Sequence, residues 1–144
     1  MEEMEARVWQ RVSGSEPMEL TQLVRLCRTA AADYRNLAAG CTGETRQTLL
    51  ALHQEAAFAA QAITGMIVLR GLEPPTSPVC FTEKQRRRSL SLAYRRSRTI
   101  WEAFQVWSSS AEFGLTFRIL AHREESISAR LLALIAACPV HKGL

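Results

Sequence analysis

The sequence lacks any uninterrupted apolar segment near the roughly 18 residues that a membrane-spanning helix requires. Its first residues, "MEEMEARVWQRVSGSEP", also lack the basic and apolar regions of a secretory signal peptide. These absences predict a cytoplasmic protein that does not associate with a membrane.

Closely paired cysteines are missing as well. The four cysteines are widely separated and form no C-x-x-C motif: Cys27, Cys41, Cys80 and Cys138. This spacing argues against a thiolate zinc site and against a disulfide framework, and it is typical of reduced thiols in a cytosol. Cys27 falls within an apolar stripe, which predicts a small core residue rather than a nucleophile.

No segment alternates apolar and polar residues with a sustained period of two, so no β-sheet is expected. Instead, apolar residues recur at spacings of three and four in four long segments, which predicts an all-α fold. The expected helices are residues 17–39, 44–70, 83–108 and 111–137. Residues 15–140 would form a single four-helix bundle domain, and residues 1–14 an N-terminal extension with the apolar spacing of a short helix.

The connections between these helices predict their topology. Short turns join the first helix to the second and the third to the fourth, so each pair should be antiparallel. The middle connection, "LEPPTSPVCFT" at 72–82, would reach roughly 36–40 Å when extended, about the length of the second helix. A long crossover between two antiparallel pairs is the ferritin-like arrangement. An ordinary up-down bundle with a slack linker is the alternative.

Glycine and serine mark the expected helix ends. Gly40 and Gly71 follow the first and second helices, where a left-handed residue commonly ends a helix. Ser109 and Glu112 match a capping box at the start of the fourth helix.

Two segments carry a resemblance to a known family. "YRNLAAGCTGETRQTLLALHQEAAFAAQAITGMIVLRG" contains Y-x-x-L-A followed by a turn and a long helix, and "EFGLTFRILAHREESISARLLALI" contains F-x-x-L-A-x-x-E. The halves echo each other, since "HQEAAF" at 53–58 aligns with "HREESI" at 122–127. Over residues 18–138 the chain resembles the rubrerythrin-like branch of the ferritin-like superfamily.

The resemblance implies where a metal site would lie. In that family each helix pair supplies one glutamate from its first helix and E-x-x-H from its second, and these groups hold two metal ions inside the bundle. Here Glu55 and Glu124 match the glutamates of E-x-x-H, whereas Phe58 and Ile127 occupy the histidine positions. Phe58 and Ile127 would add apolar bulk where the metal would sit.

The remaining ligand positions have also changed. Cys27 stands where the first helix pair would supply its lone glutamate, and Ser97, or with a shifted alignment Tyr94, stands at the other. Two carboxylates without an imidazole would hold a metal weakly at best. No bound cofactor is therefore predicted.

The state of the two glutamates stays open at this stage. They would form a buried pair that shares a proton or accepts hydrogen bonds from Ser97, Tyr34 or Tyr94, or they would lie at the margin of the core and reach water.

Histidine and arginine offer further candidates. His53 and His122 lie two residues before the glutamates, which predicts surface histidines that point away from them. Basic residues form one stripe on the third helix: Lys84, Arg88, Arg95 and Arg98. With a net charge of +4, an anion- or nucleic-acid-binding surface is conceivable, but no aromatic residues interleave with this stripe. A solvated helix face is favoured, and nucleic acid is not the expected partner.

The sequence therefore favours a rubrerythrin-like protein that has lost its di-metal centre and acts as a non-redox interaction or structural protein. One alternative is a divergent di-iron-type oxidoreductase or peroxide scavenger, which would bind iron or another divalent metal through Glu55 and Glu124. The other is a small basic module that binds an anion or nucleic acid. Because ferritin-like proteins commonly dimerise through a helix pair, the resemblance implies a homodimer, and a further protein partner is left open.

Overall fold

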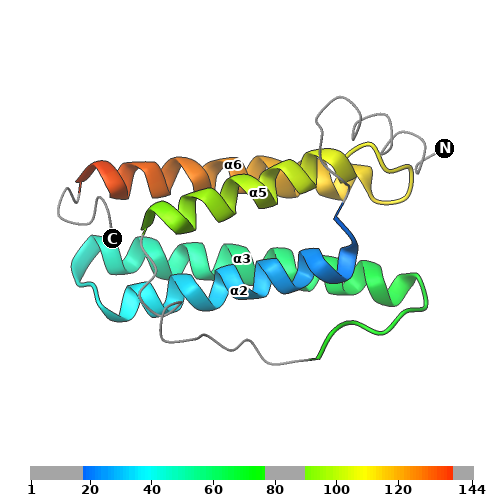
Figure 1. Ribbon diagram of the computed structural model, residues 1–144, viewed down its shortest axis with the longest axis horizontal. Coiled ribbons are helices and arrows are strands. Elements are labelled where there is room, and N and C mark those ends of the chain that lie inside the picture. The colour runs from blue at the N-terminus through cyan, green and yellow to red at the C-terminus, as the bar shows by residue number, and fades with distance from the viewer. Residues whose placement is uncertain (1–17, 77–89, 138–144) are drawn as a thin grey trace.

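The computed structural model describes residues 18–76 and 90–137, and within these residues it is entirely helical (Figure 1). The helices are α2 (Leu20–Ala39), α3 (Gly43–Leu69), α5 (Leu90–Trp107) and α6 (Gly114–Ala137). The prediction of an all-helical fold without strands is confirmed over these ranges. The predicted N-terminal extension and the predicted first turns of the third helix, residues 83–89, lie outside the described residues.

The helices pack most extensively as α2 with α3 and as α5 with α6, and the two pairs meet through α2–α5 and α3–α6 contacts. In Figure 1, α2 runs from right to left and α3 returns to the right. The next described helix, α5, begins at the left, opposite the end where α3 finishes, and α6 runs back from right to left. None of these helices is long and apolar enough to cross a membrane.

Apolar residues spaced three or four apart place one face of each helix in a common core. Its largest fully buried side chains come from all four helices: Tyr34, Phe104, Phe117, Leu23, Leu49, Leu52, Ile63, Ile67, Ile100, Leu120, Ile127 and Leu131. Phe117 lies 5.7 Å from the Phe104 ring and 5.6 Å from the Trp107 ring, centroid to centroid. The indole N–H of Trp107 donates to the Met18 carbonyl at 2.8 Å. This hydrogen bond links the last residue of α5 to the segment just before α2.

The helix ends follow the prediction in part. Gly71, with φ of 75°, adopts the left-handed conformation predicted after the second helix. Gly40 does not, because its φ is −92°, and this prediction was wrong. There α2 ends through short-range bonds from the Gly40 N–H to the Leu37 carbonyl and from the Cys41 N–H to the Ala38 carbonyl. Such a tightened last turn is available to residues with side chains.

The fourth helix starts later than predicted, at Gly114. The side chain of Ser110, rather than that of Ser109, accepts the Phe113 N–H at 2.9 Å. Glu112 is not part of a capping box in this structure, since its carboxylate accepts a hydrogen bond from the Arg70 guanidinium at 2.9 Å. An ion pair between the residue that follows α3 and the turn before α6 has replaced the local bond that the sequence pattern indicated.

Candidate functional site

Glu124 lies inside the bundle with 3% of its surface exposed. Its Oε2 accepts a hydrogen bond from the Ser97 Oγ at 2.5 Å, and Ser97 lies 2.7 Å from the Ser128 hydroxyl one turn further along α6. Burial raises the pKa of Glu124 to about 7, although the hydrogen bond from Ser97 and the charge of Arg96 act in the lowering direction. The hydrogen bond to Ser97 is one of the alternatives that the sequence left open.

Glu55 occupies a different environment at the edge of the α3–α6 contact. Its side chain is 25% exposed, and both of its oxygens accept from the Arg123 guanidinium, at 2.8 and 3.1 Å. This two-pronged geometry is the strong form of an arginine–carboxylate pair. Each glutamate therefore follows a different alternative. Glu124 is buried in the core, whereas Glu55 lies at the margin of the core and pairs with a cation.

The two residues at the positions that the family resemblance assigns to histidine, Phe58 and Ile127, also differ in burial. Ile127 is buried, but Phe58 is 45% exposed, and the Arg123 guanidinium lies 4.1 Å from the centre of its ring. The expectation that Phe58 fills the site was therefore wrong. With Glu55 at the margin of the core, the rotation of α3 carries the position three residues later still further outward.

Cys27 and Ser97, at the positions of the lone glutamates, are both buried. Burial raises the pKa of the Cys27 thiol, and the negative charge of Glu124 raises it further. The prediction that Cys27 is a core residue is confirmed. Tyr34 belongs to the same cluster, because burial, followed by the Glu124 charge, raises the pKa of its phenol well above the ordinary value.

Sequence reasoning missed the ion pair at the centre of this cluster. Arg96 on α5 pairs with Asp33 on α2, and both side chains are buried. Arg96 also lies with its guanidinium carbon 6.0 Å from the Tyr34 ring centre. Among the described residues, the Tyr34 hydroxyl and the Arg96 Nε and Nη1 groups have no hydrogen-bond partner. The sequence carried only a weak signal for this pair: Asp33 directly precedes Tyr34 and Arg96 directly precedes Ser97, two residues that were expected near the candidate metal site.

The histidines follow the surface prediction only in part. His122 is exposed, as predicted. His53 is half-buried, and its Nδ1 lies 2.7 Å from the Ala31 carbonyl of α2, so this nitrogen carries the proton and donates. His53 therefore joins α3 to α2 instead of standing free on the surface.

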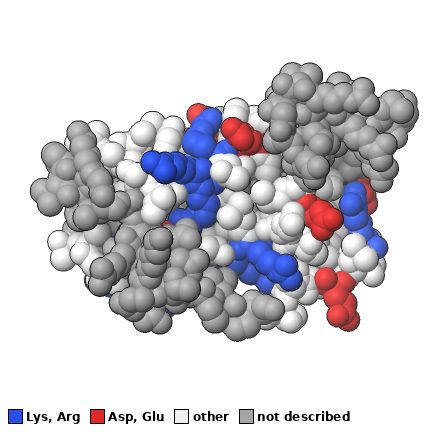
Figure 2. Space-filling model, viewed as in Figure 1, with Lys and Arg blue, Asp and Glu red and all other residues white. Residues whose placement is uncertain are grey.

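The basic stripe of the third helix is described only at its end. Lys84 and Arg88 lie outside the described residues, and Arg95 is exposed. Arg98 pairs with Glu125 at 3.0 Å and lies over the Trp101 ring at 4.3 Å. On the face seen in Figure 2, the described basic side chains form separate groups, some of them with acidic side chains beside them, and not one continuous stripe.

The donor set of this cluster does not fit the di-metal centre that the family resemblance implies. A guanidinium has only N–H donors and cannot ligate a cation, yet Arg123 and Arg96 occupy the oxygens of Glu55 and Asp33. Within residues 18–76 and 90–137, no three histidine, cysteine or acidic side chains are placed to hold a metal ion. Comparison of the chain with protein-family models, curated proteins and solved structures finds no match.

Proposed function

We propose that this chain is a ferritin-like, rubrerythrin-like bundle in which hydrogen bonds and ion pairs have replaced the di-metal centre, and that it acts as a non-redox structural or interaction protein. The observation that carries this proposal is the partnering of its two family-equivalent carboxylates. Glu124 accepts from Ser97, and Glu55 is clamped by Arg123. A pair of divalent ions would need those oxygens together with additional anionic and imidazole ligands.

The helix directions support the ferritin-like part of the proposal. The α2–α3 and α5–α6 pairs each run out and back in Figure 1, and α5 begins at the end of the bundle opposite to the end of α3. An up-down bundle would instead start α5 beside the end of α3. The end of α3 and the start of α5 therefore lie at opposite ends of the bundle, as in the ferritin-like arrangement.

Arginine supplies the positive charge that metal ions would otherwise bring to such a core. The Arg96–Asp33 pair links α5 to α2, and the Arg123–Glu55 pair links α6 to α3, so each pair bridges the two halves of the bundle. A cation that is covalently part of the chain gives this cross-link without any exchange with solvent or any redox chemistry.

An interaction role is supported by large apolar side chains that the described residues leave in solvent. They include Leu69 at the end of α3 and Leu115 and Ile119 on α6. Leu115 and Ile119 are four residues apart on α6, so they share one exposed face of that helix. Contiguous exposed apolar surface is common at protein–protein contacts. The proposal includes a homodimer, which sedimentation velocity over a range of protein concentrations would detect.

Metal analysis tests the loss of the centre. The protein is expressed with iron supplementation, purified without chelators, and analysed for iron, manganese and zinc per chain. We expect well under one ion of any of these metals per chain, and we expect Glu124→Gln to contain the same trace amount. Close to two ions per wild-type chain, lost in Glu124→Gln, would overturn the proposal and support the oxidoreductase alternative.

A further inference from the structure

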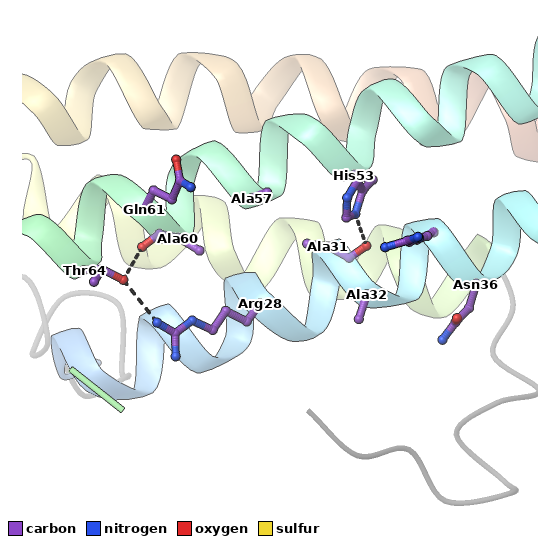
Figure 3. Close-up of a pocket in the computed structure, with 10 residues that line it drawn as sticks. Arg28, Ala31, Ala32, Asn36, His53, Ala57, Ala60, Gln61 and Thr64 are labelled. Carbon is purple, nitrogen blue, oxygen red and sulfur yellow. Dashed lines mark hydrogen bonds between the residues drawn. The ribbon is translucent and has the colours of Figure 1, made fainter. Parts of the chain in front are cut away.

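A groove of about 570 Å³ lies between α2 and α3, away from the buried cluster (Figure 3). Its size falls within the range of roughly 300–1,000 Å³ that is typical of small-molecule sites. The floor is formed by alanines of both helices: Ala31, Ala32, Ala57 and Ala60. Because these side chains end at Cβ, none of the four fills the furrow between the helices at this level.

Two cross-links between α2 and α3 hold the groove at its ends. In Figure 3, Arg28 of α2 reaches Thr64 of α3 at one end, and His53 of α3 reaches the Ala31 carbonyl at the other. Arg28 donates to the Thr64 hydroxyl at 3.4 Å and also to the Pro75 carbonyl. Because both helices are tied together, the groove is largely formed before any ligand arrives, which lowers the ordering cost of binding.

The polar rim of the groove is basic. Arg28, Arg35 and His53 line it, together with amide and hydroxyl side chains, and none of the ten lining residues is acidic. The acidic residue nearest to them in the α2 sequence, Asp33, is buried and engaged with Arg96. Within the described part of the chain, no carboxylate of the lining therefore offsets the positive charge.

Arg35 is the rim residue best placed to bind a ligand. It is exposed and has no hydrogen-bond or ion-pair partner among the described residues. It lies four residues after Ala31, and therefore on the same face of α2 as the carbonyl that anchors His53. His53 uses Nδ1 in that bond, so its Nε2 can donate to an anion only in the doubly protonated imidazolium form of the ring.

We propose that this groove binds a small organic anion, with a phosphate-monoester or carboxylate head group held by Arg35, the imidazolium form of His53 serving as a second donor, and with an apolar body lying over the alanine floor. A guanidinium binds either head group through two parallel hydrogen bonds. The groove is much larger than one oxyanion, and its alanine floor accommodates the rest of the molecule. This inference goes beyond the proposed function and does not depend on the state of the metal site.

Binding is tested on the full chain by titration with four probes, followed by NMR or calorimetry. Phenyl phosphate and benzoate carry the two head groups on the same ring, benzyl alcohol carries the ring without charge, and inorganic phosphate carries the charge without a ring. We expect saturable binding of phenyl phosphate or benzoate, at least fivefold tighter than that of benzyl alcohol or inorganic phosphate. The tighter of the two anions identifies the head group.

Three variants locate the site. Arg35→Gln removes the free guanidinium at an exposed position and should weaken anion binding at least fivefold. Ala57→Phe places a ring over the floor and should abolish binding, with circular dichroism as the check on folding. Arg118→Gln, an exposed arginine on α6 outside the groove, is the matched control and should bind like the wild type.

Several outcomes would overturn the groove proposal. They are the absence of saturable binding by either aromatic anion at millimolar concentration, equal binding of inorganic phosphate, an unchanged affinity in Arg35→Gln, and an equal loss in Arg118→Gln. The metal content of the protein is measured separately and does not depend on any of these results. The groove proposal and the proposed function can therefore each be overturned without the other.

Discussion

Ser97 on α5 donates a hydrogen bond to Glu124 on α6, with 2.5 Å between the Ser97 Oγ and the Glu124 Oε2. Neither side chain reaches solvent to any significant extent. A neutral hydroxyl stabilises a carboxylate less than a cation or several N–H donors would, and the cost of burying the charge therefore dominates. The core thus holds a carboxyl group whose proton is retained to near-neutral pH.

Glu124 should make the stability of the fold depend on pH. Its pKa rises from 4.5 to about 7 on folding, so between these values the folded state binds its proton more tightly than the unfolded state. This contribution is full below about pH 4.5 and is lost as the pH rises toward 7, by up to about 3 kcal/mol at 1.36 kcal/mol per unit. Urea unfolding of the wild type and Glu124→Gln across this range measures it.

Glu124→Gln keeps a hydrogen-bonding carbonyl oxygen but cannot ionise. We expect the stability of this variant relative to the wild type to increase from acid to neutral pH, so that it equals or exceeds the wild type above pH 7. Parallel pH profiles for the two proteins would show that Glu124 does not titrate in this window.

The Asp33–Arg96 pair should be costly to break and cheap to replace. Asp33→Ala alone leaves the Arg96 cation buried without its partner and should cost about 3–5 kcal/mol of unfolding free energy. The double variant Asp33→Leu with Arg96→Met removes both charges at similar volume and should recover most of that loss. Urea unfolding of the wild type, the single variants Asp33→Leu and Arg96→Met and their double variant completes a double-mutant cycle that gives the coupling. Additive losses would contradict the buried pair.

Glu55 should matter far less to stability than a buried acid. Its pair with Arg123 is partly exposed, so Glu55→Gln should cost no more than about 1 kcal/mol, and high salt should reduce the difference. The comparison is made by urea unfolding at low and high salt, with Arg123→Gln as the partner variant. A loss of several kcal/mol in Glu55→Gln would place this carboxylate in the core.

Two glycines should respond oppositely to the same substitution. A Cβ at Gly114 would lie 2.6 Å from the Ser108 backbone oxygen, so Gly114→Ala must displace the turn before α6 and should lower the melting temperature. A Cβ at Gly65, within α3, meets nothing within 4 Å, so Gly65→Ala should stabilise by about 0.5–1 kcal/mol through helix propensity. Thermal unfolding of both variants under one condition checks the pair. Equal shifts would mean that propensity alone decides both sites.

The positions of Glu124 and Glu55 show how much about burial can be predicted from the spacing of apolar residues. Both fall on apolar stripes at spacings of three and four, and the sequence left open whether each is buried or reaches water. The structure buries Glu124. Glu55 carries the same signal but lies at the edge, since an apolar stripe about 100° wide does not specify how each helix is turned. Phe58 was misplaced for the same reason.

By itself the sequence determined the four described helices and the burial of Cys27, because these depend on residue spacing along a helix. It left open whether Glu124 and Glu55 are buried or reach water. Only the tertiary structure decided the Asp33–Arg96 pair, whose members are 63 residues apart, and the rotation that sends Glu55 to Arg123. Such pairings depend on the distance and rotation between packed helices, which are set by side chains from the whole bundle and not by any local pattern.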